Sequence, residues 1–392
     1  MRLKSIVSLC TLTLVASVQC INAAATRIAF VDPFATARGN AFTATADNPS
    51  AVFYNAAGLT QLEGTTLQAN VFAISLDYDY KGPGVADSMD NAFQPIPSFF
   101  LAHRFADKPL ALGFGVYAPF GMGADWGANA SFATADPRVP YEADLKYVKY
   151  HAVIAWQVSD TLSLSAGVSY DDSDIDVKSI ALRYDGSANT LGYSLALHWK
   201  PHPMHAFGLN YQAKTSMNYG GNADVMVAPG VYVPLPARAK LVYPESITFG
   251  YSFRPNERWN FEFNADWTHW DRVNALVLDG VPGAAYNLNW ESAFIWEFGV
   301  TRYFADGWHL SGGYTYVENA VPDRDFLPIV PDSDRHFFAL GLGRSYENWR
   351  WQATYQYAYA SDRRVTGNTF TPADGKWGLD SQAFAFSLGY RF

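Results

Sequence analysis

Large apolar side chains alternate with small or polar ones in runs of ten or more residues along this chain. In WNFEFNADWTHW, residues 259–270, tryptophan and phenylalanine dominate one face, and asparagine, glutamate and aspartate occupy the other. The same alternation fills WRWQATYQYAYA, residues 349–360, and the chain ends on it in AFAFSLGYRF, residues 383–392. A period of two residues is typical of β-strands with one apolar face, so the sequence predicts an all-β protein.

The alternating runs number fourteen from Thr65 onward, and their connections differ in length. The predicted strands lie near residues 65–78, 95–105, 109–118, 146–157, 161–172, 189–200, 204–215, 242–254, 257–270, 291–304, 307–317, 334–345, 348–361 and 380–392. Short turns alternate with the predicted long loops 119–145, 216–241, 271–290, 318–333 and 362–379. An even strand number, with short turns at one end and long loops at the other, is the layout of a bacterial outer-membrane barrel.

The apolar face indicates which solvent surrounds the sheet. After residue 25 no run of apolar residues approaches the 18 that a membrane helix needs, and tryptophan or tyrosine begins and ends several apolar faces, as in Trp308 and Tyr316 or Trp349 and Tyr359. Aromatic belts of this kind mark the two membrane interfaces. We therefore expect a 14-stranded antiparallel transmembrane β-barrel, with a secreted β-sandwich or propeller as the alternative.

The first 25 residues have the pattern of a secretory signal peptide. Arg2 and Lys4 precede an apolar run that ends at Ala23-Ala24-Ala25, a small-residue cleavage site. Both cysteines lie in this segment, so no disulfide or cysteine metal site is expected in the mature protein. Its 26 basic and 37 acidic residues disfavour nucleic acid as a partner.

Residues 26–64 do not fit the strand pattern that fills residues 65–392. They are small and polar with scattered aromatics, and they are too long for a simple leader to the first strand. Wider barrels are often plugged by a segment of their own chain. We expect residues 26–64 to form an N-terminal hatch inside the barrel; a periplasmic tail is the alternative.

One run in this segment, DNPSAVFYNAAGL (47–59), resembles the hatch sequence of the FadL/OmpP1/TodX family of outer-membrane transporters. GFGVYAPFGMGADW (113–126), ADWTHWDRV (265–273) and AVPDRDFLPIVPDSDRHFFALGLG (320–343) are similar to further family segments, in the same order. The final strand also resembles the C-terminal aromatic pattern by which the barrel-insertion machinery recognises such proteins.

The resemblance implies a monomeric barrel with a movable hatch. Substrate would be caught among the extracellular loops, held in the lumen and released sideways into the membrane at a kink in the third strand. Asn55, Ala56 and Ala57 would be the hatch element that shifts, with Ala56 in place of the family's usual proline. Gly113 and Gly115 would be the flexible positions of the third strand, since glycine weakens strands; alternatively they only make room in the lumen.

Loop capture needs apolar surface outside the barrel. VMVAPGVYVPLPA (225–237) contains no charged residue, and an exposed apolar patch of this kind marks a binding site. The capture residues proposed from it and from a facing wall are Phe120, Met122, Trp126, Val225, Met226, Val231, Tyr232 and Leu235. The alternative is a loop folded down on its neighbours.

A fatty acid would also need a partner for its carboxylate, because burying an unpaired charge is costly. Because side chains alternate between the two faces of a strand, we expect Arg335, Lys149 and His151 to face the lumen, and these are the predicted head-group ligands. The alternative is that they form lumen salt bridges with Glu142, Asp334 or Glu297.

The predicted function is uptake of long-chain fatty acids across the bacterial outer membrane, where the barrel would also contact lipid and lipopolysaccharide. Uptake of small aromatic hydrocarbons is the alternative, and a porin or adhesin is a further one. The sequence contains no nucleophile elbow, no HExxH motif and no paired metal-ligand spacing, so we expect neither an enzyme nor a cofactor or metal site.

Overall fold

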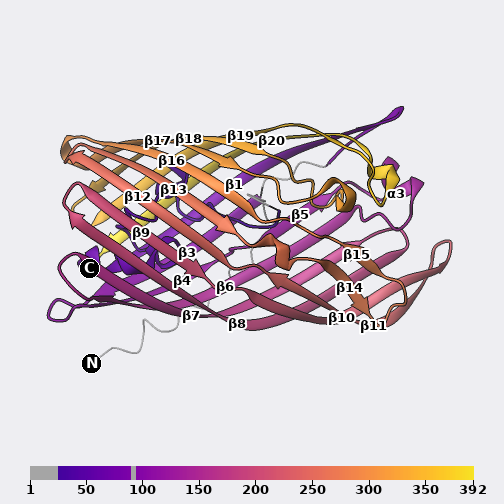
Figure 1. Ribbon diagram of the computed structural model, residues 1–392, viewed down its shortest axis with the longest axis horizontal. Helices are drawn as coiled ribbons and strands as arrows, with labels where there is room; N and C mark the ends of the chain where they lie inside the picture. Colours follow the sequence, from indigo (N-terminus) through magenta and orange to yellow (C-terminus); the bar gives the residue numbers. More distant parts are fainter. Residues whose placement is uncertain (1–24, 90–93) are drawn as a thin grey trace, which may run out of the picture.

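A computed structural model describes residues 25–89 and 94–392 and shows a closed antiparallel barrel (Figure 1). Three of its strands are interrupted, and counting each of these once gives fourteen, which confirms the predicted fold class. The barrel strands are β1 (Gly64–Gly82), β3 (Gln94–Arg104), β4 (Leu110–Tyr117) with β5 (Gly121–Asp125), β6 (Glu142–Gln157), β7 (Leu162–Lys178), β8 (Leu182–His202), β9 (His205–Gln212) with β10 (Thr215–Ala228), β11 (Val231–Tyr243) with β12 (Ser246–Asn256), β13 (Trp259–Thr268), β16 (Ala293–Tyr303), β17 (Trp308–Val317), β18 (Arg335–Tyr346), β19 (Trp349–Val365) and β20 (Gly375–Arg391).

The last strand closes the barrel. β20 pairs with β1 from Thr66↔Arg391 to Lys81↔Lys376, and with β19 on its other side. This pairing explains why the alternating pattern continues through residues 383–392. The strand has neighbours on both sides almost to its last residue, so its backbone polar groups are satisfied within the sheet. Both barrel termini therefore lie at the same end of the molecule.

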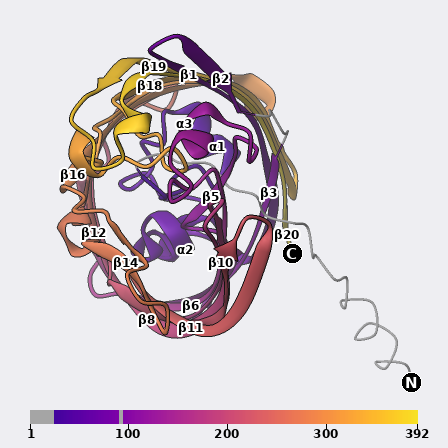
Figure 2. The same cartoon turned by 90° about the vertical axis from the view of Figure 1, so that its right-hand side faces the viewer.

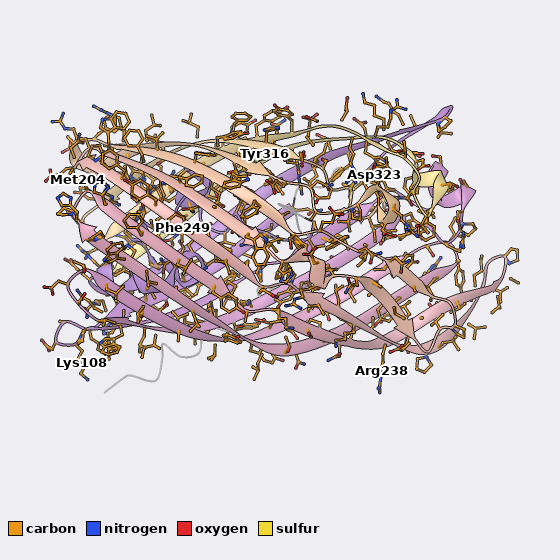
Figure 3. All side chains as sticks on the ribbon, in the orientation of Figure 1. Lys108, Met204, Arg238, Phe249, Tyr316 and Asp323 are labelled. Carbon is orange, nitrogen blue, oxygen red and sulfur yellow. The ribbon has the colours of Figure 1, made fainter. Side chains whose placement is uncertain are left out.

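Side chains on the outer wall are large and apolar, as Phe249 and Tyr316 illustrate in Figure 3. The outward side chains of Phe298, Phe338 and Phe384 are 45%, 47% and 57% exposed, whereas polar residues on the inward face are buried. A surface of this kind is stable only against lipid. No helix in residues 25–89 and 94–392 is long and apolar enough to cross a membrane.

The two ends of the barrel differ, as the sequence predicts. Short turns, including those at Lys108 and Met204, lie at the end where β1 begins and β20 ends (Figure 3). The opposite end carries β2 (Val85–Ser88), α3 (Ser131–Ala135), η2 (Trp270–Arg272), β14 (Ala275–Asp279), β15 (Ala285–Asn287), η4 (Asp323–Asp325) and η5 (Thr371–Ala373). By the rule for such barrels the short turns are periplasmic and the longer connections extracellular.

One predicted loop is wrong. Residues 216–241 continue the barrel wall as a β10–β11 hairpin with its tip at 229–230, paired from Thr215↔Tyr243 to Ala228↔Val231 with a register shift between Met226 and Ala228. Pro234 and Pro236 lie on β11, although proline donates no ladder hydrogen bond. β11 tolerates them because its other side pairs with β14 only at Arg238 and Ala239, which leaves the prolines on an edge.

The hatch fills the periplasmic half of the lumen, where α1 (Pro33–Ala37) and α2 (Ala51–Tyr54) lie inside the ring of strands (Figure 2). Asp32 begins α1 by accepting a hydrogen bond from the Phe34 amide at 2.7 Å. The 3-10 helix η1 (Ala56–Gln61) then leads to β1. Phe34, Phe42 and Leu59 are buried against inward residues of the wall. The predicted signal peptide lies outside the described residues, apart from Ala25.

Candidate functional site

An opening interrupts the barrel wall beside the third strand. β4 pairs with β3 as far as Phe99↔Val116 and with β6 as far as Tyr117↔Lys149. The strand then breaks at residues 118–120, and its continuation β5 pairs with β6. Among the described residues no pairing joins β5 to β3, so residues 94–98 of β3 form a free edge there.

The sequence of this edge suits an unpaired position. Pro95 and Pro97 alternate along it while the ladder to β1 continues through them. Alternate residues present their backbone groups to the same side of a strand, and proline brings no N–H group to satisfy. A cavity of about 270 Å³ lies at the opening, bounded by Leu76, Met89 and Gln94 on one side and by β5 on the other.

The start of the hatch crosses the break in strand three. Ile28 donates its amide to the Pro119 carbonyl at 2.8 Å, and the Gly121 amide donates to the Thr26 carbonyl at 2.9 Å. Arg27, between them, bridges to the far wall by donating to both carboxylate oxygens of Asp266, at 2.6 and 2.7 Å. The break is therefore held by the hatch segment rather than by a neighbouring strand.

The lumen contains a cavity of about 40 Å³ between the hatch and the apolar residues that close the extracellular end. Lys149 lines it, 6% exposed, with its ammonium 3.5 Å from the Asp171 carboxylate. Asp171 also accepts from the Tyr147 hydroxyl at 2.8 Å. Phe120 forms part of the apolar wall, in ring contact with Tyr147 and Tyr243. The cavity thus combines an aromatic wall with buried ion pairs, because Arg27 and Asp266 line it as well.

Comparison with known proteins identifies this architecture. The family described as "Outer membrane protein transport protein (OMPP1/FadL/TodX)" matches residues 13–184 and 178–392, nearly the whole chain. The chain belongs to this family. It is an outer-membrane transporter of hydrophobic compounds.

Individual relatives are distant. A putative outer membrane protein of Neisseria meningitidis is 22% identical over 372 residues, which cover 79% of this chain and 80% of that protein. A FadL homologue of Pseudomonas aeruginosa superposes with a TM-score of 0.84 at 19% identity, over 94% of this chain and all of that one. The toluene transporter TodX of Pseudomonas putida gives 0.73 at 13% identity, over 96% and 100%. Both structures share the fold of this FadL-family protein.

The three predicted head-group residues face inward, and they do not meet at one site. His151 uses both ring nitrogens, with the Tyr117 hydroxyl at 2.9 Å and the Ser194 hydroxyl at 2.8 Å. Arg335 is buried at the extracellular end of β18, in an ion pair with Asp332. Lys149 is the predicted residue that lines the lumen cavity. Of the alternative partners, Glu142 pairs with Lys178, Glu297 accepts from Asn40 and Asn264, and Asp334 accepts from the Asn319 amide.

The predicted capture residues divide between two places. Phe120, Met122 and Trp126 are buried in the apolar cluster that closes the extracellular end, where the Trp126 ring N–H donates to the Pro328 carbonyl at 2.9 Å. Val225, Met226, Val231, Tyr232 and Leu235 lie on the β10–β11 hairpin. The tip of this hairpin is the exposed part: Val231 is 52% exposed, and Val227 beside the predicted set is 62% exposed.

Gly113 and Gly115 lie in the regularly paired part of β4, before the break at residues 118–120. A Cβ atom at Gly113 would lie 2.6 Å from Leu59 and 2.7 Å from Val52 of the hatch. These contacts fit the alternative that the glycines make room in the lumen. Their role as flexible positions stays a prediction.

Asn55 ties the predicted mobile hatch element to the wall. Its side-chain amide donates to the Thr43 carbonyl at 2.8 Å and to the Leu197 carbonyl of β8 at 3.0 Å, and its oxygen accepts from the Ala57 amide at 3.2 Å. Ala56 follows it at the start of η1. A movement of Asn55, Ala56 and Ala57 as a unit would break the two bonds from Asn55 to Thr43 and Leu197.

Sequence reasoning missed the carboxylates that seat the hatch. Glu262 forms an ion pair with Arg38 at 3.1 Å and accepts the Ala44 amide at 2.7 Å. At the periplasmic end Asp47 pairs with Arg254 at 2.9 Å. Burial raises the pKa of Asp47, but the guanidinium groups of Arg254, Arg350 and Arg38 together lower it by more, so its pKa lies below the ordinary value. The available signal was the run of polar residues on the inward face of β13.

Proposed function

We propose that this FadL-family protein takes up long-chain fatty acids and releases them sideways into the membrane. The observation that carries the proposal is Lys149, a buried lysine facing the lumen cavity. An ammonium group has three donors, and its contact with Asp171 uses one of them. A carboxylate beside Phe120 and Tyr147 would find both a cation and an aromatic surface for its chain.

Removing the ammonium is expected to weaken fatty-acid binding. For Lys149→Met, which keeps an apolar stem of similar length, we expect the dissociation constant for oleate to rise about tenfold, as for loss of one charge-assisted hydrogen bond. Binding of oleyl alcohol should change little. Tryptophan-fluorescence titration of the detergent-purified protein measures both. Arg335→Met is the matched control, because Arg335 is paired with Asp332 away from the cavity.

Small aromatic hydrocarbons are the second candidate, and the charge balance of the lumen favours them. Arg27, Arg38 and Lys149 each have a carboxylate partner, in Asp266, Glu262 and Asp171. Glu297 adds a further carboxylate to the cavity wall. An uncharged compound would leave these pairs intact. Saturable binding of toluene, with oleate no tighter than its alcohol in wild type and Lys149→Met, would favour this substrate class.

The wall opening supports the proposed sideways exit. Each CH₂ of an acyl chain that enters water costs about 0.8 kcal/mol, so a route from the lumen directly into lipid is favoured over a watery pore. The cavity at the gap between β3 and β5 is lined by inward residues such as Leu76 and Gln94. Its prolines and its lack of strand pairing lower the free energy needed to widen the gap, because few backbone hydrogen bonds have to break.

Closing this gap is expected to abolish uptake. Gln94→Cys and Ala124→Cys both lie at the cavity of the opening, one on each side, and the sequence after residue 20 contains no other cysteine. Cross-linking them with a flexible bis-maleimide should reduce uptake of a fluorescent fatty acid by whole cells to the level of cells lacking the protein. Each single-cysteine variant, treated in the same way, is the control. Unchanged uptake in the cross-linked protein would contradict release through this gap.

A further inference from the structure

A hollow of about 820 Å³ marks the lipid-facing wall over β12, β13, β16 and β17. Outward side chains in this region form rows across neighbouring strands, and Phe263, Phe298 and Tyr314 make up one of them. The next row towards the periplasmic turns is Phe261, Val300 and Gly312. Because Gly312 has no side chain, the second row is incomplete, and the hollow extends from it past Phe261.

The barrel itself does not require a glycine at position 312. A Cβ atom there would meet nothing closer than 4.0 Å, so a larger side chain has room. The neighbouring Gly313 differs, because a Cβ atom there would lie 1.8 Å from the Gly39 amide of the hatch. Gly313 thus serves the inside of the barrel, whereas Gly312 leaves space on the outside.

A cation lies beside this space at the end with the short turns. Arg302 follows Val300 by two residues on β16, and therefore lies on the same outward face. Its guanidinium centre is 4.6 Å from the Trp259 ring centroid and 5.4 Å from that of Phe304. Among the described residues no carboxylate forms an ion pair with it. Ring stacking thus positions the guanidinium while leaving its donors available.

We propose that this groove binds one phospholipid of the periplasmic leaflet, with the phosphate at Arg302 and an acyl chain over Gly312. The charge complementarity selects a phosphate, and the short-turn end places that phosphate at the periplasmic interface. Lipid tails are as apolar as the wall, so the groove contributes shape and close packing rather than hydrophobic burial. The site is separate from the lumen and does not depend on which compound is transported.

Native mass spectrometry of the full-length protein with phosphatidylglycerol tests this site. Arg302→Gln removes the cation, and Gly312→Leu fills the groove. Each should raise the dissociation constant of the first bound phosphatidylglycerol about tenfold, as expected for loss of a charge-assisted hydrogen bond or of a close packing contact. The matched controls are Gly220→Leu and Arg238→Gln, a cross-strand pair at the extracellular end. A Cβ atom at Gly220 meets nothing within 4 Å, so the substitution has equal room.

The heat-dependent shift of a folded barrel on a denaturing gel shows that each variant is folded. Wild-type affinity in Arg302→Gln, or in folded Gly312→Leu, would overturn the proposal. An equal loss of lipid in the control variants would also overturn it, because it would mean that lipid binds the whole outer wall without preference. If Gly312→Leu does not fold, Arg302→Gln decides the result alone.

Discussion

Gly313→Ala is expected to unseat the hatch, while Gly312→Ala, one residue away, leaves it in place. The Cβ atom added at Gly313 would lie 1.8 Å from the Gly39 amide nitrogen and 2.1 Å from the Arg38 carbonyl carbon. Gly39 is itself confined, because it has φ +57° and a Cβ atom there would lie 2.6 Å from the Tyr314 backbone. Both obstacles are backbone, which cannot rotate away as a side chain does.

Overpacking of this severity should destabilise the seated hatch by about 3 kcal/mol. Limited proteolysis of the folded protein in detergent measures the effect, because a displaced hatch exposes residues 26–63 to the protease while the barrel stays intact. The expected outcome is rapid cleavage of Gly313→Ala and wild-type resistance of Gly312→Ala, whose new Cβ atom has 4.0 Å of space. Equal resistance of the two variants would show that the hatch does not press against β17 here.

Glu262→Ala is expected to have a comparable effect for an electrostatic reason. The Glu262 carboxylate is the ion-pair partner of Arg38, at 3.1 Å, and both side chains are fully buried. It also accepts hydrogen bonds from the Ala44 amide and from the backbone and hydroxyl of Thr45. Removing it leaves a buried guanidinium without a counter-charge, which typically costs about 3–5 kcal/mol.

Equilibrium unfolding in urea, followed separately by hatch proteolysis and by far-ultraviolet circular dichroism, separates loss of the hatch from loss of the barrel. The hatch transition of Glu262→Ala should move to lower urea, and the barrel transition should stay. Glu63→Ala is the matched control, since that glutamate is 82% exposed in its pair with Arg391 and should change stability by less than about 0.5 kcal/mol. A wild-type hatch transition in Glu262→Ala would rule out this carboxylate as the seat.

The functional site was only partly predictable from sequence. Strand parity correctly turned Lys149, His151 and Arg335 inward, since the side-chain direction alternates with each residue. It did not show that His151 is held by Tyr117 and Ser194, or that Arg335 pairs with Asp332 at the far end of the lumen. Depth along a strand and the choice of partner depend on register between strands, which parity does not specify.

The break in the third strand shows the same limit. Glycine is the residue that sequence rules associate with strand bends, and Gly113 and Gly115 were the natural candidates. The break lies at residues 118–120, where the hatch residues Thr26 and Ile28 bond to the strand in place of a neighbour. Pro119 is a local signal within the break, because proline donates no ladder hydrogen bond. The contacts that hold the break join segments about ninety residues apart, and local sequence patterns do not predict them.

By itself the sequence determined the barrel: its strand number, its lipid-facing wall, its closing strand and the presence of a segment sized to fill it. These properties follow from a period of two and from turn composition, which act over a few residues. Only the tertiary structure decided where the wall opens and what holds the hatch. Thr45 and Glu262 bond although they are 217 residues apart, and a polar inward residue has the same pattern whether it meets water, substrate or the hatch. The three-dimensional arrangement alone distinguishes these cases, because burial and pairing are properties of the folded contacts.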